Sequence, residues 1–119
     1  MQDFRKLKCW QRSHSLAVLI YQMTARFPKS ELFGLTSQIR RAAISIPANI
    51  AEGCGRSGGV ELRRFCQIAL GSTYELESHV LLSRDVGCLG KTDAELLEQN
   101  VLEVKRMLSA LIHKLSEQI

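Results

Sequence analysis

The segment Gln38–Gly53 reads QIRRAAISIPANIAEG and carries the strongest structural signal in the chain. Its apolar residues recur at steps of three or four, which is the spacing of one helix face. Further apolar residues flank this stripe, so little of the helix is left for water and we expect it to be buried. Pro47 predicts a kink, and Gly53 is expected to end the helix. The stripe consists of Leu35, Ile39, Ala42, Ile46 and Ile50.

The rest of the chain repeats this amphipathic pattern in three further segments. Helices are predicted at about residues 7–26, 35–53, 60–86 and 92–117, separated by Pro28 and by two glycine-containing turns. No segment alternates with the two-residue period of a β-strand. Since 119 residues suit one domain, the sequence predicts a single all-α, antiparallel up-down-up-down four-helix bundle.

Two local features of the later helices lead to specific expectations. Thr92, with Glu95 three residues on, has the spacing of a capping box and is expected to begin the fourth helix. Gly71 interrupts the third helix at a cost of about 1 kcal/mol relative to alanine. We expect this glycine to allow another helix to approach closely.

Cysteine usage and hydropathy indicate a cytoplasmic protein. Cys9, Cys54, Cys66 and Cys88 form no C-x-x-C pair, which favours small apolar core residues in a reducing compartment. The first residues lack the apolar region of a signal peptide, and the longest apolar run, Leu16–Tyr21, is too short to cross a bilayer.

Positive charge is concentrated in the first half of the chain. Residues 1–66 contain eleven Lys/Arg against four Asp/Glu, a balance of +7, whereas residues 67–119 contain five against eight, a balance of −3. An antiparallel bundle brings the start of helix 1, the turn between helices 2 and 3, and the end of helix 4 to one end. We call this end the basic pole. Its basic residues are Arg5, Lys6, Lys8, Arg12, Arg56, Arg63, Arg64 and Lys114, and its acidic residues are Asp3, Glu52, Glu61 and Glu117, which leaves +4.

A positive pole can neutralise phosphates, so it is a candidate surface for nucleic acid. The alternative is a solvated basic surface without a partner. No aromatic-rich RNA-reading motif is present, so recognition would depend on shape and charge. The residues predicted to bind nucleic acid are Arg5, Lys8, Arg12, Arg56, Arg63 and Arg64.

A second group of polar residues lies within the apolar helices. It consists of Ser45, Asn49, Glu52, Ser72 and Glu75. We interpret these residues as a structural hydrogen-bond network between helices, which would also satisfy the carbonyl freed by Pro47. The alternative is an acid–base site built on the two carboxylates. No paired nucleophile and base accompany them, so catalysis is the weaker interpretation.

Metal and cofactor signals are weak. Glu75 with His79, and His113 with Glu117, are spaced at i, i+4, whereas di-metal bundles use Glu-x-x-His at i, i+3. The glycine-rich turn CGRSGG at residues 54–59 lacks the Lys-Ser/Thr of a phosphate-binding loop. We therefore expect neither a metal nor a cofactor.

Several segments together resemble a known family. They are SIPANIAEG after QIRRAA, IALGSTYELES at Ile68–Ser78, FPKSELFGL at Phe27–Leu35, and Leu7 with Trp10. This pattern is similar to the four-helix-bundle proteins encoded in intervening sequences of bacterial 23S rRNA genes. The resemblance implies a ring-shaped homopentamer, as in the related accessory variability proteins of diversity-generating retroelements. Those relatives bind nucleic acid and a reverse transcriptase through a basic barrel surface.

The residues also favour self-association, because helices 1 and 2 carry more apolar surface than one bundle needs. The sequence thus predicts a non-enzymatic, oligomeric bundle that holds structured RNA, such as rRNA or its intervening segment, through the basic pole. The alternative function is a structural scaffold that recruits another polypeptide, such as a reverse transcriptase, without touching nucleic acid. An enzyme is the third interpretation.

Overall fold

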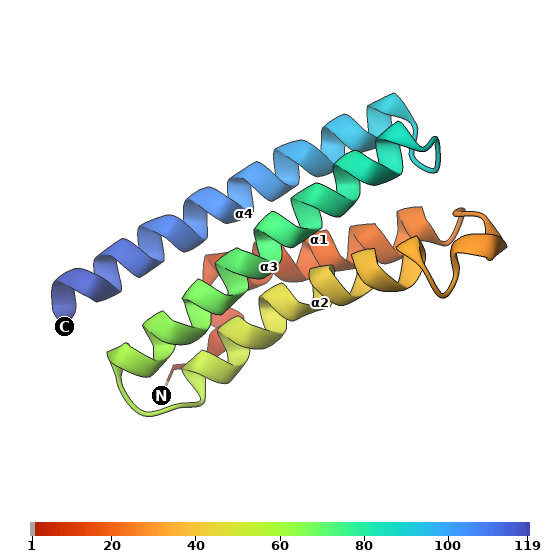
Figure 1. The fold of residues 1–119 in the computed structure, drawn as a ribbon. Helices are drawn as coiled ribbons and strands as arrows, with labels where there is room; N and C mark the ends of the chain where they lie inside the picture. Colours follow the sequence, from red (N-terminus) through yellow and green to blue (C-terminus); the bar gives the residue numbers. More distant parts are fainter. Residues whose placement is uncertain (1) are drawn as a thin grey trace.

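The computed structural model describes residues 2–119 and contains four long α-helices (Figure 1). The helices begin and end close to the predicted positions, with differences of one or two residues at their ends. Two short 3₁₀ helices precede α1 and α2. The elements are η1 (Phe4–Lys6), α1 (Lys8–Thr24), η2 (Lys29–Glu31), α2 (Leu35–Cys54), α3 (Gly59–Asp85) and α4 (Lys91–Gln118).

The four helices form an elongated bundle that measures 45 × 22 × 20 Å. Helix α1 packs on α2 and α4, and α3 packs on the same two helices. Figure 1 shows successive helices running in opposite directions along the long axis. The predicted all-α four-helix bundle is confirmed, and no strand occurs among residues 2–119.

The core is built from the predicted apolar stripes. In α2, Ile39, Ile46 and Ile50 are completely buried. Helix α4 contributes a heptad-spaced row to the same core, because alternating steps of three and four keep one face toward the neighbouring helices. The buried residues of this row are Ala94, Leu97, Val101, Val104, Leu108 and Leu115.

One flank of α2 is more open than the sequence indicates. Ile44 is 46% exposed and Ala48 is also exposed, since no helix within residues 2–119 covers that side. The expectation that the middle of this helix has little surface for water is therefore wrong for one flank. Pro47 is buried within the continuous α2, and the kink there stays a prediction.

The roles predicted for Gly53 of α2 and Gly71 of α3 are both wrong, since α2 runs past Gly53 and ends at Cys54. Gly53 lies inside the last turn of α2, and a Cβ placed on it would meet Phe65 Cβ at 2.9 Å. A Cβ on Gly71 would meet nothing within 4 Å. The close helix approach therefore requires Gly53, and the expectation for Gly71 is wrong because that residue faces open space.

Replacing Gly71 with alanine is expected to raise the free energy of unfolding by about 0.5–1 kcal/mol. The added methyl group meets no neighbour, while alanine loses less backbone entropy than glycine when the helix forms. Urea unfolding followed by circular dichroism measures this change. A lower midpoint for Gly71→Ala would show that another molecule or segment occupies the space above this residue.

The fourth helix starts without a side-chain cap. Gly90 occupies the N-cap position, and its carbonyl accepts a 2.9 Å hydrogen bond from the backbone N–H of Ala94. Thr92 lies within the first turn, so the predicted capping box with Glu95 is wrong. The extended backbone of Gly90 already turns the chain into the helix two residues earlier.

The four cysteines are free thiols. Cys9, Cys54 and Cys66 are buried in the core, and Cys88 is half-buried. Burial raises the pKa of Cys9 to about 11 and that of Cys66 to about 12. These two thiols stay protonated near neutral pH, so they have the low reactivity of apolar core residues. Within residues 2–119, every helix is too polar or too short to traverse a lipid bilayer.

Candidate nucleic-acid interface and apolar groove

The basic pole is assembled from segments far apart in the sequence. The backbone N–H of Gln2 donates to the carbonyl of Cys54 at 3.3 Å, which ties the N-terminal segment to the end of α2. Figure 1 shows both termini at the end of the bundle where α2 turns into α3. A small depression there is lined by residues of all these segments, including Gln2, Arg56 and Gln118.

Four of the six predicted nucleic-acid-binding residues form ion pairs within the chain. Each holds its carboxylate at 2.8–3.0 Å, on the protein surface. The hydrogen bond from Arg5 lowers the pKa of Asp3, and the hydrogen bond from Arg64 lowers that of Glu61. The pairs are Arg5–Asp3, Arg12–Glu103, Arg56–Glu52 and Arg64–Glu61.

The aromatic ring of Phe65 further fixes two of these arginines. The guanidinium carbon of Arg64 lies 4.4 Å from the ring centroid, and that of Arg56 lies 5.2 Å from it. Both distances allow a cation–π interaction. The two guanidinium groups are therefore held in place by a carboxylate and a ring, which leaves them less free to turn toward a ligand.

The remaining cations of the basic pole have no acidic partner within ion-pair distance in residues 2–119. Arg63 only donates a 3.4 Å hydrogen bond to Ser116 Oγ. The sequence count of +4 omitted Glu103, which pairs with Arg12 across the α1–α4 contact. With Glu103 included, eight basic residues face five acidic ones and the pole carries +3. The unpaired cations are Lys6, Lys8, Arg63 and Lys114.

The structure brings together three of the five residues of the predicted polar network. Ser45 Oγ and Ser72 Oγ lie 2.8 Å apart and join α2 to α3. The side-chain amide of Asn49 donates to the carbonyl of Ser45 at 2.7 Å and to its Oγ at 3.0 Å. The amide therefore bonds Ser45 and not the carbonyl of Ala43 that Pro47 frees.

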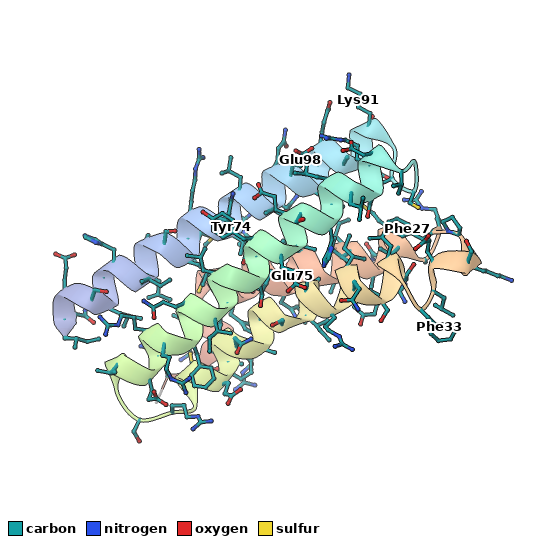
Figure 2. All side chains as sticks on the ribbon, viewed as in Figure 1. Phe27, Phe33, Tyr74, Glu75, Lys91 and Glu98 are labelled. Carbon is teal, nitrogen blue, oxygen red and sulfur yellow. The ribbon has the colours of Figure 1, made fainter. Side chains whose placement is uncertain are left out.

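The two carboxylates of the predicted network lie outside it. Glu52 pairs with Arg56 at 2.8 Å, and Glu75 (Figure 2) lies 3.3 Å from His79 Nε2. Glu52 and Glu75 thus bind separate partners on the helix surface and form no shared acid–base pair. Residues 2–119 contain no cluster of three or more His, Cys, Asp or Glu that could hold a metal ion.

An apolar groove between α1 and α2 is the main surface feature that the sequence did not locate. It has a volume of about 500 Å³. Trp10 and His14 stack at one end with ring centroids 4.7 Å apart, and Tyr21 lies at the other end. Ile44 and Ala48, the open flank of α2, form one wall. We define the α1–α2 groove by Trp10, His14, Ala17, Val18, Tyr21, Gln22, Ile44, Pro47, Ala48 and Ala51.

A second exposed apolar feature continues from this groove to the end of the bundle. Phe33, in the connection between α1 and α2, is 92% exposed, and Leu32 beside it is 49% exposed. A smaller hollow lined by both residues, of about 410 Å³, shares Tyr21 and Ile44 with the groove. The sequence feature that could have indicated this exposed surface is the adjacent apolar pair Leu32–Phe33 in a short connection between helices. A single bundle does not require two apolar residues there.

These features define an all-α four-helix-bundle protein with a basic end and an open apolar face. A family model described as "23S rRNA-intervening sequence protein" matches residues 5–110. The chain belongs to this family.

A solved structure supports the fold independently. It is the crystal structure of a protein of unknown function from the S23 ribosomal protein family of Bacteroides thetaiotaomicron VPI-5482. The two chains are 23% identical and superpose with a TM-score of 0.78, over 87% of this chain and 97% of the other. At this identity the likeness concerns the fold alone. Among curated proteins none matches this chain.

Proposed function

We propose that this protein is a non-enzymatic, oligomeric helical bundle that binds structured RNA through its basic pole. The supporting observation is that Lys6, Lys8, Arg63 and Lys114 lie at one end of the bundle and have no acidic partner among residues 2–119. Free cations can exchange their counterions for phosphates, whereas an ion-paired arginine must first give up its carboxylate. The family description, which refers to 23S rRNA, makes ribosomal RNA or its intervening segment the natural candidate.

The ion pairs divide the predicted binding residues into arginines that already hold a carboxylate and cations that do not. Arg5, Arg12, Arg56 and Arg64 are engaged by carboxylates, so we assign them a supporting role at the edge of the surface. Lys8 and Arg63 stay at its centre, and Lys6 and Lys114 are added. The four come from η1, α1, α3 and α4, so only the folded bundle presents them together.

Exchanging Arg63 and Lys114 for glutamate tests this proposal. The protein is titrated into a fluorescein-labelled RNA hairpin, and anisotropy is followed at several salt concentrations. We expect the double variant to bind at least about tenfold more weakly at low salt, with a log–log salt dependence about two units shallower. Both side chains are partly or fully exposed, so the fold should persist.

The matched control exchanges Lys29 and Lys91 for glutamate at the opposite end. This variant has the same change in net charge, and neither lysine forms an ion pair within residues 2–119. We expect its RNA affinity to change by less than about threefold, since these charges lie at the far end of a bundle 45 Å long, beyond the Debye length of about 10–30 Å at 0.1–0.01 M salt. Equal losses in both double variants would reject a localised RNA-binding pole.

The oligomeric part of the proposal rests on the α1–α2 groove. A contiguous exposed apolar surface is typical of a protein–protein interface. We infer that copies of this chain associate through this face, with five copies in a ring as the family resemblance implies. Light scattering at micromolar concentration tests this, because a monomer mass would reject self-association.

The same apolar face supports a second candidate function, a scaffold that recruits another polypeptide without binding nucleic acid. A reverse transcriptase is the partner implied by the resemblance. The two functions give different results in the same titration. Absence of salt-dependent RNA binding by the intact oligomer would favour the scaffold. Either function is compatible with the cytoplasmic location that the sequence predicts.

A further inference from the structure

The groove and the exposed Phe33 lie at different positions along the bundle. Helix α2 rises about 1.5 Å per residue, so Leu35, two residues after Phe33, lies about 14 Å from Ile44 and about 24 Å from Ala51. Phe33 therefore lies beyond the end of the groove in its own chain. The Phe33 ring therefore cannot fill the groove of its own chain, whereas Phe33 of a second molecule can.

The connection that carries Phe33 is held by a set of hydrogen bonds. The backbone N–H of Glu31 donates to the carbonyl of Pro28 at 2.9 Å, and its own carbonyl accepts from Gly34 at 3.0 Å. The Glu31 carboxylate accepts a 3.1 Å hydrogen bond from the N–H of Leu35, at the start of α2. The loop thus has a defined shape, and Figure 2 shows Phe33 projecting from it, away from the helices.

Exposure on this scale is unusual for phenylalanine, which is one of the residues most often buried. Phe27, six residues earlier in the same connection, is only 7% exposed because it packs into the core. Phe33 makes no comparable contact within its own chain. The rigid presentation of an apolar side chain, together with a groove of apolar walls, gives this one chain both halves of an interface.

We propose that Phe33 of one copy, with Leu32 beside it, docks in the α1–α2 groove of a second copy. This inference rests on the proposed homo-oligomer and names the contact that forms it. The groove walls offer an aromatic end at Trp10 and an aliphatic wall at Ile44, which suit a phenyl ring. Because every copy carries one projecting residue and one groove, the same contact can be repeated around a closed assembly.

Site-specific crosslinking tests the contact directly. Phe33 is replaced by the photoreactive p-benzoyl-phenylalanine, and isotopically light and heavy copies of the protein are mixed before irradiation. We expect mass spectrometry to find light–heavy crosslinks that join residue 33 to residues 10–22 or 44–51. Crosslinks confined to one copy, or directed to α3 or α4, would overturn the proposal.

Two variants separate this contact from the oligomer as a whole. Phe33→Ala removes the projecting ring, and Ala48→Trp fills the groove, so each should weaken association about tenfold or more on dilution. Leu102→Ala, which trims an exposed side chain on α4, is the control and should leave association unchanged. Phe33 and Ala48 are exposed, so neither change should disturb folding, which circular dichroism checks.

The outcomes distinguish the proposed homo-oligomer from the proposed Phe33 contact within it. A monomeric wild-type protein would overturn the homo-oligomer and this contact together. A wild-type oligomer whose Phe33→Ala and Ala48→Trp variants dissociate at the same concentration as wild type would overturn the contact alone. Weaker association in both variants but not in Leu102→Ala supports the docking of Phe33.

Discussion

Replacing Ile46 with alanine is expected to lower the free energy of unfolding by about 2–5 kcal/mol. Ile46 is completely buried in the middle of α2, the helix that packs against both α1 and α3. Removing its outer carbon atoms takes away apolar contacts and leaves a cavity between three helices, which a close-packed core can only partly close. Urea unfolding followed by circular dichroism, at one fixed protein concentration, measures the loss.

Ile68→Ala is the matched control for this change. Ile68 lies on α3 and is 41% exposed, so the same atoms are removed from a side chain that is already partly in water. We expect a loss below about 1 kcal/mol, the usual range for a surface position. Equal losses at Ile46 and Ile68 would show that α2 does not occupy the centre of the core.

Replacing Gly53 with valine is expected to destabilise the bundle by about 3 kcal/mol, the upper part of the usual range for overpacking. A Cβ at this position would lie 2.9 Å from Phe65 Cβ and 3.0 Å from Leu62 Cδ1. The Cβ of Phe65 is fixed to its backbone, so α2 and α3 must separate to make room. The separation would also disturb the turn that carries Arg56.

Gly71→Val is the control for the same exchange in the neighbouring helix. Nothing lies within 4 Å of a Cβ at Gly71, so this variant should unfold within about 0.5 kcal/mol of wild type. The comparison removes the common effect of losing a glycine from a helix. A Gly53→Val protein as stable as Gly71→Val would disprove the close packing of α2 on α3.

The comparison of these glycines also indicates how far sequence reasoning extends. A glycine within a helical pattern shows that something is unusual there, because its helix propensity is poor. Whether a neighbour touches it depends on how the helix is rotated about its axis. The pattern predicts close packing at Gly71, but α3 turns that residue to the outside and places Gly53 of α2 against Leu62 and Phe65.

The candidate binding surface shows the same limit. The order of the helices was enough to predict that the N-terminal basic residues and the α2–α3 turn would share one end. It could not predict that Arg12 reaches Glu103, which lies 91 positions later in the chain on α4. Ion pairing between helices depends on side-chain register. Only the folded structure therefore shows which cations lack an acidic partner among residues 2–119.

The sequence by itself determined the number, order and approximate limits of the four helices and the identity of most core residues. These follow from apolar spacing and from Pro28 and the glycine turns, which act over a few residues. Only the tertiary structure decided which cations lack an acidic partner among residues 2–119 and which glycine lies in close contact with a neighbouring helix. It also decided that α1 and α2 leave an apolar groove and an exposed Phe33. These properties depend on the rotation and neighbours of each helix, and such long-range geometry is set by packing of the whole chain.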